Sequence, residues 1–264
     1  WHPNYHQKRI APLLGVLEAA TKGTVRRALD SGSLRLLGQS APVSTVIADD
    51  LKRPVAAAPL VIDWESMGPI RPEVTDHEAP TVGFMGQVRR EKGFEQFLEA
   101  VWELPGVRIG GAVSPDRGSP PARFDELAGR ISSLPNSSVR THALSSEDYA
   151  DVLRSLDIVA LPYDPELYAQ RTSNILVEAV GLGVVPVAPS KSYLGQVMTT
   201  EGIGVTYSDY SAEGLRKALV QAADQLTELR SGMAPLSEEW RRTQTADGVL
   251  ELILDGNKEE LGTD

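Results

Sequence analysis

Short apolar segments alternate with amphipathic helical segments from about residue 81 onward, and this alternation is the feature that most restricts the fold. The first apolar segment is TVGFMG at 81–86. In the segment after it, Phe94, Phe97, Leu98 and Val101 recur at the spacing of one helix face. Strands that alternate with helices of this length form βαβ units. The sequence therefore predicts an α/β fold, a Rossmann-like parallel sheet with right-handed crossovers and helices on both faces.

The rest of this region continues the alternation. Further strands are expected at 107–113, 138–144, 157–163, 184–189 and 204–208. Further helices are expected around 124–131, at 145–156, at 174–182, over 215–229 and at 236–254. Ser145 followed by Asp148 three residues later is a helix start signal. Ligands of parallel sheets bind in the loops at the carboxyl ends of strands, so a site is expected there.

Residues 1–66 do not share the regular alternation of the later part of the chain. They contain an expected helix with Ile10, Leu13, Leu14 and Leu17 on one face, a strand at 34–39, a helix near 42–52 and an extended segment at 55–62. We interpret them as the remnant of a larger N-terminal α/β domain. The Pro-rich, polar stretch at 67–80 is expected to be a linker. The first residue is Trp1 rather than methionine, which is compatible with a fragment or a processed form.

Composition excludes several classes of function. The 26 basic and 36 acidic residues give a net charge of −10, which argues against nonspecific binding to nucleic acid or to an anionic membrane. Cysteine is absent, so disulfide and thiolate chemistry are excluded. No apolar run has membrane-spanning length and no signal peptide is recognisable, so we expect a cytoplasmic protein without a transmembrane segment. The histidines lack a metal-binding spacing, and no metal site is expected.

The first stretch that suits a ligand is GFMGQVRREKG at 83–93, between a strand and a helix. Gly86 allows close approach of the backbone, and the helix after the stretch offers free N–H groups. Arg89, Arg90 and Lys92 add positive charge, a combination that suits a diphosphate. The alternative is a solvated basic turn. The stretch is not a dinucleotide fingerprint, because it lacks G-x-G-x-x-G.

The second stretch is LPYDPELYAQRTSNILVEAVGLGVVPVAP at 161–189. Residues 172–174 (TSN) are N-cap types directly before an apolar helix, so free amides are expected at the end of the sheet. Arg171 adds a planar cation suited to phosphate oxygens. Glu178 lies about one turn inside the helix, where a carboxylate needs a hydrogen-bonding partner. A ribose diol can supply that partner; the alternative is a partner within the protein, such as a backbone amide or an arginine.

As an ordered set, these motifs carry a family resemblance. Residues 81–254 resemble the C-terminal, donor-binding domain of a family 4 retaining glycosyltransferase of the GT-B type. The resemblance rests on G-x-x-x-x-x-K-G at 86–93, SLDIVALPY at 155–163, SNILVEAVGLGVVPV at 173–187 and GIG at 202–204. It covers about two thirds of the chain and implies a domain at 81–235, a crossover helix and tail at 236–264, and an acceptor-side remnant at 1–66.

The resemblance also implies roles for single residues. Lys92 would bind the donor diphosphate, Glu178 the ribose hydroxyls, and Leu144 would pack against the nucleobase. The amides near residues 173–175 would bind the same phosphates. The full set of donor-binding candidates is Gly86, Gln87, Arg89, Lys92, Leu144, Thr172, Ser173, Asn174, Ile175 and Glu178.

Two positions depart from the family pattern. Gln87 stands where a basic residue is usual, and Arg89 or Arg90 is the expected replacement. Gln170 stands where the family has a glutamate near the transferred sugar. Related sequences with an Arg-Thr-Ser turn use the arginine in compensation, so Gln170 and Arg171 are the catalytic candidates.

The expected function is transfer of a sugar from a nucleoside diphosphate sugar, with UDP or GDP as the nucleotide, in carbohydrate biosynthesis and with retention of configuration. No cofactor or metal is expected. The acceptor, a glycan, a lipid or a small molecule, is not specified, and the resemblance is compatible with peripheral membrane contact through an absent N-terminal part. The alternatives are a noncatalytic nucleotide-sugar-binding or interaction module, and a GT-B epimerase.

Overall fold

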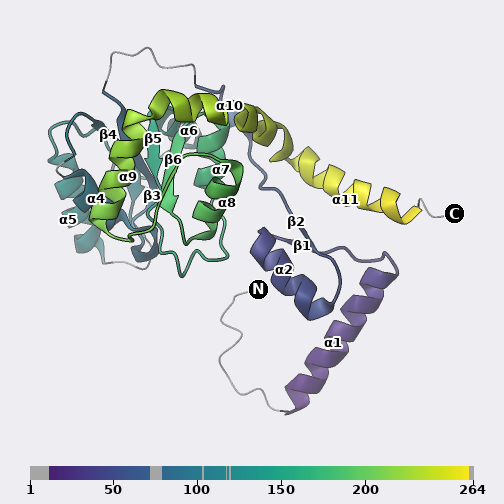
Figure 1. Cartoon of the computed structure of the whole chain (residues 1–264). Helices are drawn as coiled ribbons and strands as arrows, with labels where there is room; N and C mark the ends of the chain where they lie inside the picture. The colour runs from purple at the N-terminus through teal and green to yellow at the C-terminus, as the bar shows by residue number, and fades with distance from the viewer. Residues whose placement is uncertain (1–11, 72–78, 103, 117, 119, 262–264) are drawn as a thin grey trace. The chain divides into compact units, whose positions relative to one another are not determined.

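The computed structural model describes residues 12–71, 79–102, 104–116, 118 and 120–261 (Figure 1). Contacts divide the chain into two compact units, Trp1–Ala58 and Pro59–Asp264. The sequence had placed the end of the N-terminal part at residue 66. The interpretation of that part as an acceptor-side remnant, and of the later part as a donor-binding domain, stays a prediction. No helix among the described residues is long and apolar enough to cross a membrane.

The N-terminal unit consists of two helices and two very short strands. In chain order these are α1 (Pro12–Asp30), β1 (Leu37–Gly38), α2 (Ala41–Leu51) and β2 (Ala56–Ala57), with β1 parallel to β2. Ser40 caps α2 by accepting a hydrogen bond from the Val43 amide. Arg26 on α1 donates to the carbonyl of Leu51, which ties the two helices together. Of the expected helix, Ile10 lies outside the described residues. The strand expected at 34–39 is reduced to two residues.

The C-terminal unit contains one five-stranded parallel sheet, which confirms the predicted fold class. Its strands lie in the order β4-β3-β5-β6-β7, and every neighbouring pair is parallel. Their bounds are Thr81–Gln87 for β3, Arg108–Ser114 for β4, Ile158–Ala160 for β5, Val185–Pro189 for β6 and Val205–Tyr207 for β7. Each strand is almost wholly buried, because helices cover both faces of the sheet.

The helices of this unit lie mostly on the two faces of the sheet, and the last of them extends away from it (Figure 1). They are α3 (Trp64–Met67), α4 (Phe94–Val101), α5 (Pro121–Ser132), α6 (Ser146–Ser155), α7 (Asn174–Gly181), α8 (Tyr193–Glu201), α9 (Ala212–Asp224), α10 (Leu226–Thr243) and α11 (Ala246–Leu261), with a 3-10 turn at Arg90–Lys92 before α4. The crossovers from β3 to β4 and from β5 to β6 run in opposite directions. Right-handed connections therefore place α4 and α7 on opposite faces. Accordingly α4 packs against α5 and α9, and α7 packs against α10.

The prediction of a strand at 138–144 is wrong. Only isolated bridges form, between Ile109 and Ser137 and between Ala112 and Arg140. The segment lies beside β4, where the Arg140 amide donates to the carbonyl of Gly111 at 3.0 Å. It is the outermost segment of the sheet and mostly half-exposed or exposed, so little apolar burial extends its pairing further.

The C-terminal helices also differ from expectation. The helix predicted over 215–229 is interrupted at Gln225, between α9 and α10, and the helix predicted at 236–254 is interrupted at Gln244, between α10 and α11. Gln244 leaves the helical path because its side chain accepts from the Leu60 amide at 2.6 Å and its carbonyl from the Ile62 amide at 3.1 Å. Thr245 then caps α11 through the Gly248 amide. Helix α8, which begins at the capping Ser192, was not predicted.

At the amino ends of β3 and β5, a buried carboxylate joins several elements. Asp157 is 2% exposed and accepts hydrogen bonds from the Thr81 amide at 2.6 Å and from Arg230 on α10 at 2.7 Å. Arg71 lies 3.1 Å from the same carboxylate. These contacts fix the segment that leads into the sheet and leave the opposite edge, where β3 and β5 end, open to loops.

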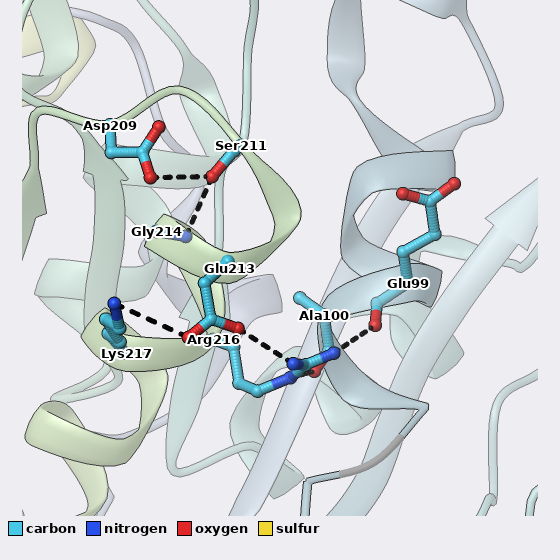
Figure 2. Close-up of polar contacts among 8 residues, drawn as sticks. All are labelled: Glu99, Ala100, Asp209, Ser211, Glu213, Gly214, Arg216 and Lys217. Atoms are coloured by element: carbon cyan, nitrogen blue, oxygen red, sulfur yellow. Dashed lines mark hydrogen bonds and ion pairs between the residues drawn. The ribbon is translucent and has the colours of Figure 1, made fainter.

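An arginine joins α9 to α4 (Figure 2). Arg216 donates to the carbonyls of Glu99 and Ala100, both at 3.0 Å, and to the carboxylate of Glu213 at 2.8 Å. Carbonyls in the last turn of a helix lack intrahelical partners and carry partial negative charge, which a guanidinium satisfies. Because α4 begins directly after the loop at 88–93, these hydrogen bonds of Arg216 fix the position of the helix that follows the loop.

Candidate functional site

The order of the strands locates the candidate site. The chain leaves β3 toward β4 on one side and leaves β5 toward β6 on the other, so the two connections diverge. A crevice opens where such connections diverge, at the carboxyl ends of the strands. Two loops meet there, 88–93 after β3 and 161–173 after β5, and they contain the two stretches selected from the sequence.

Glycines bring these loops together. Gly86 has φ 121° and Gly93 has φ 68°, both in the region that favours glycine. A Cβ atom on Gly93 would lie 2.0 Å from the carbonyl oxygen of Pro162, so only glycine allows this approach of the two loops. A Cβ atom on Gly86 would lie 3.1 Å from Nζ of Lys92 and 3.6 Å from Ile175. Three of the predicted donor-binding residues therefore meet at the end of β3.

Lys92 is half-buried beside an aromatic ring. Its Nζ lies 5.4 Å from the ring centroid of Tyr163. Burial, with the nearby Arg89 guanidinium, lowers the pKa of Lys92 to about 8, while Glu91 and Glu178 oppose the shift. The effects of burial and of Arg89 outweigh those of the two carboxylates, so the ammonium form of Lys92 is only partly stabilised. An anionic ligand such as a diphosphate would stabilise it further.

Glu178 has a partner within the protein. Tyr149 on α6 donates its hydroxyl to Oε2 of Glu178 at 2.5 Å. Burial raises the pKa of Glu178, and the Tyr149 hydrogen bond and the charge of Lys92 oppose that shift. A carboxylate can accept about four hydrogen bonds, so the tyrosine leaves capacity for a ligand. The sequence reasoning missed Tyr149, although a tyrosine in the buried stripe of a helix signals a hydroxyl that needs a partner.

Glu178 also lines a cavity of about 370 Å³ within the C-terminal unit. Leu144, Ser145 and Asn174 line the same cavity, which is closed on another side by residues 61–67 around α3. The structure thus brings together the residues predicted for the base, for the ribose and for the phosphates. Asp63 also lines this cavity, although the sequence placed it in the N-terminal remnant at 1–66 and gave no sign of this position.

Helix α7 begins at the cavity without a side-chain cap. Ser173 occupies the N-cap position, yet its side chain accepts no hydrogen bond from the first turn. Ser173 is buried and lies beside the Tyr163 hydroxyl. Burial raises the pKa of that hydroxyl and Ser173 opposes the shift, but the hydroxyl completes no hydrogen bond with a described residue. Amides of an uncapped first turn are available to an anion.

The remaining predicted residues lie around this centre. Arg171 is exposed, with its guanidinium 5.9 Å from the ring centroid of Tyr168, which in turn packs on Tyr163. Gln170 is exposed, and Thr172 and Gln87 are half-buried. Neither catalytic candidate, Gln170 or Arg171, lines the cavity of Glu178. Among the described residues, no group of three or more His, Asp or Glu side chains could hold a metal ion.

Comparisons with known proteins identify the fold. No family model and no curated protein matches the sequence. A glycosyltransferase from Rickettsia africae ESF-5 superposes with a TM-score of 0.68 at 13% identity, over 98% of this chain and 69% of that one. A sucrose-phosphate synthase from Thermosynechococcus elongatus superposes with a TM-score of 0.62 at 14% identity, over 86% of this chain and 58% of that one.

A third similar structure is the catalytic domain of starch synthase IV from Arabidopsis thaliana, bound to ADP and acarbose. Its TM-score is 0.55 at 14% identity, over 77% of this chain and 52% of that one. These structural neighbours are glycosyltransferases, and the sheet flanked by helices is the Rossmann-like fold of their GT-B type. The chain spans between about half and just over two thirds of the length of these neighbours.

Proposed function

We propose that the chain is the donor-binding part of a glycosyltransferase that takes a sugar from a nucleoside diphosphate sugar. The observation that carries the proposal is the shared cavity of Leu144, Asn174 and Glu178, with Lys92 near enough to Glu178 to affect its pKa. A base against Leu144, a ribose on Glu178 and a diphosphate toward Lys92 would match the order of groups in such a donor.

The chemical role of this site is to stabilise a leaving group. As the bond between sugar and diphosphate breaks, negative charge grows on the phosphate oxygens. Lys92, Arg89 and the first amides of α7 would stabilise that charge, and because they are held in place before the reaction, little reorganisation is needed. These groups would carry out what a metal ion does in other phosphate sites, so the proposal includes no metal. Retention of configuration is proposed on the sequence resemblance alone, and a cytoplasmic location on the composition of the sequence alone.

The first test is calorimetric titration of the chain with UDP, GDP, ADP and UDP-glucose. We expect one nucleotide to bind, and Lys92→Ala and Glu178→Ala to weaken its binding by about 1–3 kcal/mol each, the scale of a hydrogen bond to a charged group. Lys217→Ala and Glu239→Ala are matched controls, because both residues are exposed and do not line the cavity. Folded protein that binds none of the four compounds would oppose the proposal.

Activity is a separate question, because the two catalytic candidates, Gln170 and Arg171, are exposed and do not line the cavity. A noncatalytic nucleotide-sugar-binding module has the same donor site. Hydrolysis or transfer of the sugar from the bound donor, with chromatography of the products, separates the two functions. Release of free nucleotide that depends on Lys92 would support the enzyme, and binding without release would support the module.

A further inference from the structure

A second cavity, of about 460 Å³, borders the loop at 88–93. Its lining comes from four places in the C-terminal unit: that loop, the first turn of α4, the first turn of α5, and the loop between β7 and α9. It shares no lining residue with the cavity of Leu144 and Glu178. Its volume is within the range of small-molecule sites.

The charge at this cavity is mainly positive. Arg89, Arg90 and Arg123 contribute three guanidinium groups, and Glu95 contributes the one carboxylate of the lining. Arg123 is paired with Glu95 at 2.5 Å, and both side chains are about half exposed. Guanidinium groups bind phosphate and carboxylate oxygens in two-pronged geometry. Arg89 is paired with Glu91 at 3.4 Å, so the net positive charge of these side chains is that of Arg90, and it favours an anionic ligand.

Two donors at the cavity lack acceptors. Nε of Arg89 and Nε2 of Gln96 are buried and make no hydrogen bond with a described residue. The Tyr207 hydroxyl lies near Gln96. Burial raises the pKa of Tyr207 and Gln96 opposes that shift, but the two side chains do not complete a hydrogen bond. Buried donors in folded proteins normally find an acceptor, so this arrangement calls for acceptor atoms from a ligand or from water.

Aromatic rings form the walls. Tyr210 is 41% exposed, and its hydroxyl donates to the carbonyl oxygen of Pro162 at 3.3 Å, which fixes the ring at the cavity. Phe124 lies at the start of α5 and is partly buried, and Phe94, which also lines the cavity, is almost fully buried. The carbon face of a sugar ring packs on such rings, while its hydroxyl groups accept hydrogen bonds from donors like Gln96.

We propose that this cavity binds an anionic monosaccharide, with a phosphate or carboxylate on Arg90 and Arg123 and the sugar ring against Tyr210. The site is separate from the nucleotide cavity and does not depend on the proposed function. The loop at 88–93 borders this cavity through Arg89 and Arg90 and also carries Lys92.

The test is calorimetric titration of the full chain with glucose 6-phosphate and with glucuronate. Glucose and inorganic phosphate, the two halves of glucose 6-phosphate, are titrated separately for comparison. We expect one of the anionic sugars to bind, and to bind at least about tenfold more tightly than either half alone. Arg123→Gln and Arg90→Gln should each weaken that binding about five- to tenfold. Arg130→Gln, on the last turn of α5 and outside the cavity, is the matched control and should change it less than about twofold.

Several results would overturn the proposal. These are no binding of either anionic sugar, equal binding of inorganic phosphate, or equal effects of Arg123→Gln and Arg130→Gln. Competition with UDP, GDP or ADP would place the sugar phosphate in the nucleotide site and would also overturn it. Because the anionic sugar is titrated without nucleotide, this result and that of the nucleotide titration can fail independently.

Discussion

The lowered pKa of Lys92 makes nucleotide binding dependent on pH in a specific direction. In the unliganded protein, burial and Arg89 lower the pKa of Lys92 to about 8. A diphosphate beside Nζ favours the ammonium form, so the ligand binds the protonated protein preferentially. Affinity is then fully present below pH 8 and is lost as the pH rises through 8. The protonated fraction falls about tenfold between pH 7 and pH 9, so Kd should rise about tenfold over that range.

Few neighbouring groups titrate in the same range. Burial raises the pKa values of Tyr149 and Tyr163, so both phenols remain protonated at pH 9. The second ionisation of a phosphate group is near 6, so the ligand changes little above pH 7. The assay is calorimetric titration at pH 7, 8 and 9 with whichever of UDP, GDP and ADP binds most tightly.

Two substitutions isolate the effect of Lys92. Lys92→Arg keeps the positive charge in this range, because arginine is always protonated in proteins, and should remove the pH dependence. Lys92→Met should bind weakly at every pH and also lack the dependence. An unchanged Kd between pH 7 and pH 9 in the unmodified chain, or the same tenfold rise in Lys92→Met, would refute the reasoning.

Three further predictions concern single contacts. Tyr149→Phe removes the hydrogen bond to Glu178 and should lower the free energy of unfolding by about 1–3 kcal/mol. The same substitution should change nucleotide affinity less than about threefold. If Tyr149→Phe and Glu178→Ala lost the same affinity, Glu178 would be a structural carboxylate only. Arg216→Ala should lower stability by about 1–2 kcal/mol, measured by urea unfolding, with Arg216→Lys losing less because it keeps the charge at the end of α4. Asp157→Asn leaves Arg230 buried without its carboxylate and should cost about 3–5 kcal/mol in the same unfolding assay; a loss below about 1 kcal/mol would contradict the role of Asp157 in joining the elements.

The periodic part of the fold could be predicted from the sequence because it depends on local pattern. Phe97 and Leu98 are both fully buried, as the helical spacing required, and Ser145 caps α6 as predicted. The error at 138–144 has a physical cause, since apolar alternation does not tell whether a segment finds a partner strand on both sides. The interruption at Gln244 depends on hydrogen bonds to Leu60 and Ile62, residues far away in the sequence.

The candidate site, like the fold, could be predicted from the sequence only in part. Gly86, Lys92 and Ile175 belong to two stretches about 90 residues apart, and their meeting results from the sheet order together with the motifs. The partner of Glu178 could not be chosen from the sequence. A backbone amide, an arginine or a ribose satisfies a buried carboxylate as well as Tyr149 does. Only the packing of α6 against the sheet brings that hydroxyl within 2.5 Å.

The most direct measurement is a crystal structure of the chain with the nucleotide selected by titration. We predict the base against Leu144, the ribose hydroxyls within hydrogen-bonding distance of Glu178, and the phosphates between Lys92 and the first turn of α7. Glu178 would keep its hydrogen bond to Tyr149 through one oxygen. A nucleotide bound elsewhere, with Glu178 in contact with Tyr149 alone, would contradict the central claim that this carboxylate belongs to a nucleotide-sugar site.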